Sequence, residues 1–159
     1  MFRPRLSVTV TTRVGRRVLL LVALSYAAHC FAQSLPTTEL AINGHRVTAE
    51  VAATVASRTV GLMHRFSLRT DNGMLFMFEA PQPLAFWMKD TYIPLSIAFV
   101  GADGRILNIE DMAPQTETTH NSRGLALFAL EMKKGWFAQH GIAAGDHIDG
   151  VQKVPKAVE

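Results

Sequence analysis

The chain has 159 residues, with 16 Lys or Arg and 13 Asp or Glu, and its formal net charge is +3. This length is enough for one domain and too short for two. Five arginines and no acidic residue stand in residues 1–32, which leaves 11 basic and 13 acidic residues, net −2, in the remainder. The basic charge therefore belongs to the N-terminal segment. The net negative charge of the remainder argues against a nucleic-acid partner, which would need a basic patch on the folded domain.

Residues 1–32 have the pattern of a secretory signal peptide. The arginines precede an apolar run of eleven residues, 18–28, whereas a membrane-spanning helix needs roughly twenty. The small residues Cys30 and Ala32 then predict cleavage after Ala32. We therefore expect a periplasmic or secreted mature protein with no membrane attachment after cleavage.

Two other signals stay open for this segment. Cys30 could be lipidated, but the preceding His29 is larger than the residue normally found there. The pair Arg16-Arg17 could belong to a twin-arginine export signal, although paired arginines are common in ordinary leaders. Cys30 is the only cysteine of the chain. The mature protein is then without a thiol, which excludes disulfides, thiol catalysis and cysteine-bound zinc.

The mature chain is expected to open with a polar linker, residues 33–38, and a β-hairpin. Asn43-Gly44 supplies the positive φ angles of a type I′ turn between two runs of alternating apolar residues. The spacing then changes to that of a helix over 54–63, with Thr54 as N-cap. If that helix runs on, Arg58 and Arg65 share one face.

The central part of the chain reads as short strands. The apolar run 74–78 is short enough for a core strand, a second apolar piece spans 86–88, and 95–100 and 105–111 form a hairpin. A polar loop is expected over 113–124. Residues predicted to be largely buried are Leu75, Phe76, Phe78, Phe86, Ile97, Phe99, Leu127 and Leu130.

The last part is expected to hold one more long strand, over 125–132, and a helical turn, over 135–139. A turn at Gly145-Asp146 then leads into a final short strand. The pattern predicts one mainly β domain of the α+β class over residues 39–152, with a disordered tail over 153–159. We expect a small curled sheet or partly closed β-barrel with two short helices.

Three ordered segments carry a likeness to a known family. They are Arg58 to Arg65, Gly73 to Phe76, and Phe86 to Leu95. Later residues fit as well, namely Leu130-Glu131, Gly135, Gly141 and Gly145-Asp146. The chain resembles the family called domain of unknown function 192 (DUF-192) over roughly Leu40 to Val151. Many relatives have Asn at Asp90 and Asp at Ser96, so the chain departs from the family at both. The resemblance implies a compact β-rich domain, often exported, and no established activity, substrate or cofactor.

The most site-like stretch of the sequence is Trp87 to Thr91. It brings together the ring of Trp87, the cation Lys89, the carboxylate Asp90 and the hydroxyl of Thr91. A ring beside a cation and a hydroxyl suits a small anionic or carbonyl-bearing ligand. The plainer interpretation is that Trp87 fills the core, Asp90 or Thr91 caps a turn, and Lys89 is solvated.

Arg58 and Arg65 could complete an anion site with Lys89. The plainer interpretation is that each guanidinium holds a loop carbonyl or a carboxylate such as Glu131. Our site hypothesis is that Arg58, Arg65, Trp87 and Lys89 border one concave patch, with the strand through Trp87 beside the strand 74–78.

No pattern in the mature sequence specifies catalysis or a metal. The histidines lack metal-site spacing, and Met74 and Met77 would point to opposite faces of a strand, which favours core packing. We name no catalytic residue, no metal ligand and no cofactor.

We expect a monomeric binding or interaction module with a small anionic ligand or a protein partner. The alternative is an extracytoplasmic hydrolase or ligand-modifying enzyme without metal or thiol, acting through Lys89, Asp90 and His120.

Overall fold

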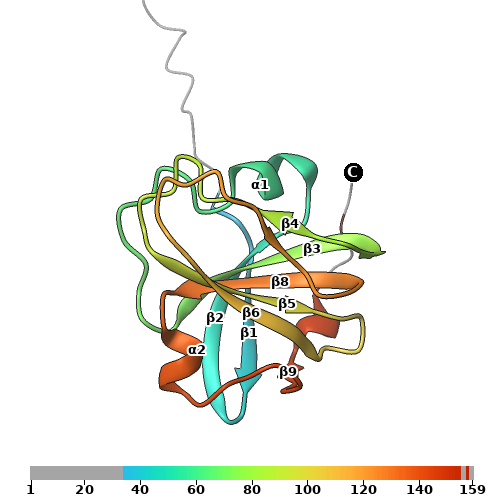
Figure 1. Cartoon of the computed structure of the whole chain (residues 1–159). Coiled ribbons are helices and arrows are strands. Elements are labelled where there is room, and N and C mark those ends of the chain that lie inside the picture. Colours follow the sequence, from blue (N-terminus) through green and yellow to red (C-terminus); the bar gives the residue numbers. More distant parts are fainter. Residues whose placement is uncertain (1–33, 155–156, 158–159) are drawn as a thin grey trace, which may run out of the picture. The chain divides into compact units, whose positions relative to one another are not determined.

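A curled sheet of seven strands is the main element of the fold in the computed structural model, which describes residues 34–154 and residue 157 (Figure 1). Its strand order is β6-β5-β8-β3-β2-β1-β9. In chain order the bounds are β1 Thr37–Ile42, β2 His45–Ala52, β3 Asn72–Gln82, β5 Leu95–Val100, β6 Ile106–Met112, β8 Ala126–Lys133 and β9 Ile148–Asp149. The predicted signal peptide lies outside the described residues.

The hairpin and the first helix form where the sequence predicts them. Asn43 and Gly44 both have positive φ, 49° and 85°, and join antiparallel β1 and β2. Helix α1, Val55–Val60, has Thr54 as its N-cap, and Thr54 and Ser57 form a capping box. The helix ends at Val60 and is capped by Gly61, which takes a φ of 49°.

The remaining elements are short. A separate two-stranded ribbon pairs β4, Ala85–Phe86, with β7, His120–Asn121. Helix α2, Trp136–Gln139, follows β8, and a 3₁₀ turn, Val151–Lys153, follows β9. The fold class is confirmed: the protein is mainly β, with two short α-helices and a curled, half-closed sheet. No helix in the described ranges is long and apolar enough to cross a membrane.

Both faces of the sheet are covered by apolar side chains. This explains why the sequence of β3 contains a continuous apolar run. Leu75 and Met77 belong to the cluster that takes residues from every strand of the curled sheet, whereas Met74 and Phe76 belong to a second cluster on the opposite face. Phe78 packs against this second cluster. A strand buried on both faces has no polar alternation. Met74 and Met77 therefore pack in the core on opposite faces, as predicted.

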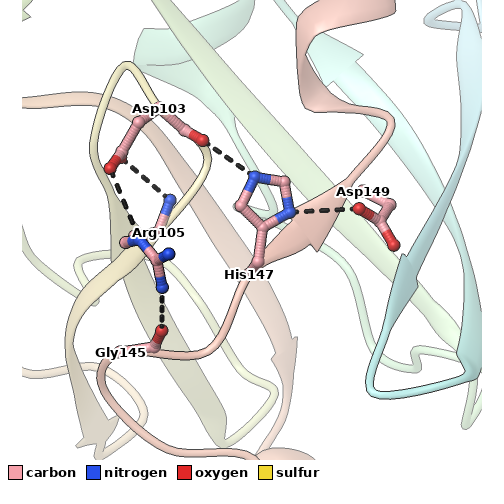
Figure 2. Close-up of polar contacts among 5 residues, drawn as sticks. All are labelled: Asp103, Arg105, Gly145, His147 and Asp149. Atoms are coloured by element: carbon pink, nitrogen blue, oxygen red, sulfur yellow. Dashed lines mark hydrogen bonds and ion pairs between the residues drawn. The ribbon is translucent and has the colours of Figure 1, made fainter.

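The two edges of the sheet meet where residues 103–105 lie beside residues 145–149 (Figure 2). The backbone of residues 145–148 bonds to that of residues 104–106 through Ile106 N to Asp146 O, 2.9 Å, and Ile148 N to Gly104 O, 2.9 Å. His147 lies between Asp103 and Asp149, with its Nε2 2.8 Å from the Asp103 carbonyl oxygen and its Nδ1 3.0 Å from Asp149 Oδ1. Because β9 also pairs with β1, this contact links the β6 edge to β1 at one point and leaves the sheet half-closed.

Several sequence predictions need correction. Strand β4 ends at Phe86, so no strand runs through Trp87, and β3 lies between β2 and β8 instead of beside that segment. Helix α1 ends at Val60, so Arg58 and Arg65 do not share a helical face. The predicted polar loop 113–124 contains the short strand β7.

The predicted core is largely confirmed. Five of its members are buried, namely Leu75, Phe76, Ile97, Phe99 and Leu130. The other three, Phe78, Phe86 and Leu127, are only half-buried. Regular structure begins at Thr37, inside the predicted linker, and Val154 of the predicted tail is buried.

Candidate functional site

A cavity of about 390 Å³ opens on the face of the sheet that carries the second apolar cluster. It lies between α1 with the turn that follows it, β3, β8 and the segment 85–91. This volume is in the range of small-molecule sites, which begin at roughly 300 Å³. The cavity is therefore the candidate site of the described domain.

Aromatic rings form much of the cavity wall. Phe76 and Phe86 meet edge to face with centroids 4.9 Å apart, and Phe78 meets Phe86 in the same way at 6.4 Å. Trp87 also lines the cavity, and 49% of its surface is exposed, so it does not fill the core as the plainer interpretation expected. A half-exposed indole at a cavity wall leaves a large apolar surface for a ligand.

Arg58 lines the cavity from α1 and is held in place by the protein. Its Nη1 donates to the carbonyl oxygens of Ala53, at 3.1 Å, and Met77, at 3.0 Å. Its guanidinium carbon lies 5.0 Å from the centroid of the Phe78 ring. The two hydrogen bonds are the loop tether of the plainer interpretation. They also hold the guanidinium of Arg58 over one face of the Phe78 ring.

The segment Trp87 to Thr91 is a turn. Thr91 is buried and lines the cavity, and its hydroxyl donates to the Lys89 carbonyl oxygen, 3.2 Å away. Asp90 has a φ of 52°, and its carbonyl oxygen accepts from the His64 amide at 2.9 Å. Asp90 therefore ties two loops together and does not line the cavity.

Lys89 is exposed beside the cavity wall. Its Nζ lies 4.0 Å from Glu117 and 5.7 Å from the centroid of the Trp87 ring. It does not line the cavity itself. Its contact with the exposed indole is a surface cation–π interaction of modest strength.

Arg65 lies apart from the cavity. Its two terminal nitrogens donate to both carboxylate oxygens of Glu50, at 2.5 and 2.7 Å. The hydrogen bond to Glu50 raises the pKa of Arg65 above its ordinary value, against the opposing effect of burial. Of the six residues named from the sequence, the structure places Arg58, Trp87 and Thr91 on the cavity and Lys89 next to it. Arg65 and Asp90 hold loops.

Glu131 is the residue of this site that the sequence reasoning missed. It stands on β8 opposite Met74 of β3 and Ile97 of β5, is 4% exposed, and lines the cavity. Within the described residues its carboxylate has no hydrogen-bond or ion-pair partner. The same part of the chain holds no fully buried side-chain oxygen without a partner, so the carboxylate oxygens must reach the cavity. Burial raises the pKa of Glu131 to about 8.

The sequence did contain a signal for Glu131. It is the only charged residue in the run Ala126 to Met132, which otherwise reads as a strand buried on both faces. A carboxylate in such a run is costly unless something pairs with it or it is protonated. The sequence reasoning named Glu131 as part of the family likeness and as a partner for an arginine, but not as a site residue.

The residues of the enzymatic alternative do not form a nucleophile–base pair. His120 lies on β7, and its Nδ1 is 3.0 Å from Glu110 Oε2, while Lys89 faces Glu117. Across residues 34–154, no group of three or more His, Cys, Asp or Glu is placed to hold a metal ion. The geometry around His120 is that of a partly buried hydrogen bond to Glu110 and does not specify a reaction.

Comparison with known proteins gives a family match. The family model of domain of unknown function 192, described as Uncharacterized ACR, matches residues 38–150. Comparison with curated proteins gave no match.

Two solved structures are similar over most of the chain. One, from Sinorhizobium meliloti 1021, is described as a candidate transcription regulator; it is 34% identical, with a TM-score of 0.71, over 73% of this chain and 95% of that chain. The other, from Novosphingobium aromaticivorans DSM 12444, is described as a protein of unknown function; it is 36% identical, with a TM-score of 0.70, over 80% of this chain and 94% of that chain.

Proposed function

The chain belongs to the family of domain of unknown function 192, and we propose that its mature domain is an extracytoplasmic module that binds a small ligand in the cavity beside α1. The observation that carries the proposal is the pairing of an aromatic wall with a buried carboxyl group that has no partner in the described protein. A concave, mostly apolar cavity with a few convergent polar groups is the usual form of a ligand site.

The extracytoplasmic location is supported by the pattern of residues 1–32 and by the absence of cysteine after Cys30. The net charge of −2 after residue 32 does not favour DNA, so the description of the Sinorhizobium meliloti protein is not carried over. Intact mass of the protein from a periplasmic extract tests the location. A chain that begins at Gln33 is expected, whereas an unprocessed chain in the cytoplasm would contradict it.

Ligand binding is tested with three fragments of similar size: 2-phenylethylamine, 2-phenylethanol and 3-phenylpropionate. Trp87 reports on the cavity because the only other tryptophan, Trp136, is buried. We expect at least one fragment to shift the Trp87 emission, with a Kd on the order of a millimolar, as is typical for ligands of this size.

Two phenylalanine substitutions on α1 locate the binding. Thr59 lines the cavity, so Thr59→Phe should fill it and weaken fragment binding at least about tenfold, or about 1.4 kcal/mol. Ala56 is exposed on the same helix and does not line the cavity, so Ala56→Phe is the matched control and should leave binding within about twofold. Equal effects of the two variants, or no binding of any fragment, would contradict the proposed function.

A further inference from the structure

Resting on the proposed function, we propose that the ligand of this cavity carries a protonated amine on an apolar body and that the ammonium group pairs with the carboxylate of Glu131. Two features lie behind this proposal: a buried carboxyl group without a partner among the described residues, and aromatic rings of the same cavity that contact cations.

The protein offers Glu131 no hydrogen-bond donor in its described part. The two hydroxyls of the cavity donate elsewhere, Thr59 to the Val55 carbonyl oxygen at 2.8 Å and Thr91 to that of Lys89 at 3.2 Å. Arg58 makes no hydrogen bond or ion pair to Glu131, and its Nη1 serves two backbone carbonyls. A ligand that satisfies the carboxylate must therefore bring its own donors, and an ammonium group brings three.

The rings of the cavity wall point to the same chemistry. Phe78 carries the guanidinium of Arg58 at 5.0 Å from its centroid, and Trp87 carries the ammonium of Lys89 at 5.7 Å. The negative faces of aromatic rings attract cations, most strongly where water is excluded. A ligand ammonium group would thus find a carboxylate and an aromatic wall in one cavity.

The charges around Glu131 are few. Its cross-strand neighbours are the apolar Met74 on β3 and Ile97 on β5. Among the described residues that line the cavity, Arg58 on α1 is the only other charged one, and Lys89 and Asp90 stand outside the lining. Burial keeps the pKa of Glu131 at about 8, so without a ligand the carboxyl group holds its proton at neutral pH. Binding of an ammonium group then releases this proton to solvent and leaves an ammonium–carboxylate pair.

The pH dependence of fragment affinity tests the proposal on the protein purified after expression of the full chain. Below pH 8, binding of 2-phenylethylamine competes with a proton, so its affinity should rise about tenfold per pH unit from pH 6 to 7 and level off above pH 8. The affinity of the neutral 2-phenylethanol should not change over this range. Calorimetry at pH 7 in two buffers of different ionisation enthalpy should show about one proton released per amine bound.

Glu131→Gln removes the charge and keeps the shape of the side chain. It should weaken 2-phenylethylamine at least about tenfold at pH 8 and leave 2-phenylethanol within about twofold. Glu39→Gln makes the same chemical change on β1, away from the cavity, and should alter neither affinity. Near-ultraviolet circular dichroism checks the fold of each variant. If a variant does not fold, the pH profile of the unsubstituted protein still tests the proposal.

The outcomes separate the two proposals. The amine proposal would be overturned if the affinity for 2-phenylethylamine changed neither with pH nor on Glu131→Gln. If Thr59→Phe still blocked binding in that case, the ligand-binding function would stand. Tighter binding of 3-phenylpropionate than of the amine at pH 7 would also overturn it, in favour of the anionic ligand that the sequence suggested. Failure of all three fragments to bind would remove both proposals.

Discussion

The buried carboxyl group of Glu131 should make the stability of the protein depend on pH in a way that one substitution removes. The pKa of Glu131 is raised to about 8 in the folded state by burial and returns to its ordinary value of about 4.5 on unfolding. Between these two values the folded state holds a proton that the unfolded state loses. The free energy of unfolding therefore falls as pH rises, by about 1.4 kcal/mol per pH unit, and this contribution is complete above pH 8.

The size of the effect follows from the width of that pH window. Over about three units the folded protein should lose roughly 3–5 kcal/mol relative to a variant without the titrating group. Glu131→Gln is such a variant, because its amide stays neutral. The difference in free energy of unfolding, variant minus unsubstituted protein, should be nearly flat below pH 4.5, rise through pH 5 to 8, and level off near pH 8.

Urea denaturation at pH 4, 5, 6, 7, 8 and 9 measures this difference. All other titrating groups are common to the two proteins and cancel in it, while an unsatisfied amide would add only a constant offset. Glu39→Gln, an exposed substitution of the same kind, serves as the control and should show no such rise. A difference that does not change between pH 5 and 8 would refute the reasoning, because Glu131 would then titrate alike in both states.

Other predictions concern packing and ion pairs. Phe76→Ala should cost about 3–5 kcal/mol in denaturant melts, since Phe76 is 2% exposed; a loss below about 1 kcal/mol would contradict its place in the core. Arg65→Ala should cost about 1–2 kcal/mol because it breaks the bidentate pair with Glu50, which is about one-third exposed. Lys89→Ala should change the free energy of unfolding by no more than about 0.5 kcal/mol, because Lys89 is exposed. Equal costs for Arg65→Ala and Lys89→Ala would contradict the assignment of Arg65 to a structural pair and Lys89 to the surface. Gly73→Ala should destabilise by about 1–3 kcal/mol, because its Cβ would lie 2.5 Å from the Glu131 carbonyl oxygen; an unchanged melting temperature would speak against this packing.

Local patterns predicted the elements that local chemistry decides. Asn43-Gly44 has few alternatives to a tight turn, and Thr54 with Ser57 starts a helix through contacts three residues apart. The apolar run around Phe76 predicted a buried strand because it is too short for a helix. A strand buried on both faces accommodates consecutive apolar side chains. These are short-range rules, and the structure confirms them.

Long-range pairing was the part that the sequence could not supply. β2 and β3 pair in parallel across the crossover that contains α1, and β8 inserts between β3 and β5, which are nearer in sequence to each other than to β8. The proximity rule placed the segment of Trp87 beside β3, and it failed because β8 occupies that position. The link between the sheet edges at His147 rests on residues more than forty positions apart.

The candidate site shows the same division. Arg58 and Trp87 were brought to one cavity, but Arg65 was not, because α1 ends at Val60 and the chain turns away. Glu131 could not be placed there from sequence, since its position depends on the pairing of β8 with β3 and β5. Site residues delivered by distant strands need the topology first.

The most direct test of the account is the titration of the Glu131 carboxyl carbon by nuclear magnetic resonance, with and without 2-phenylethylamine at saturation. Glu131→Gln identifies the resonance. The account predicts a midpoint at about pH 8 in the free protein and a midpoint well below it when the amine is bound, because an ammonium group nearby favours the carboxylate. A free midpoint near 4.5, or one that the bound amine does not move, would contradict the account.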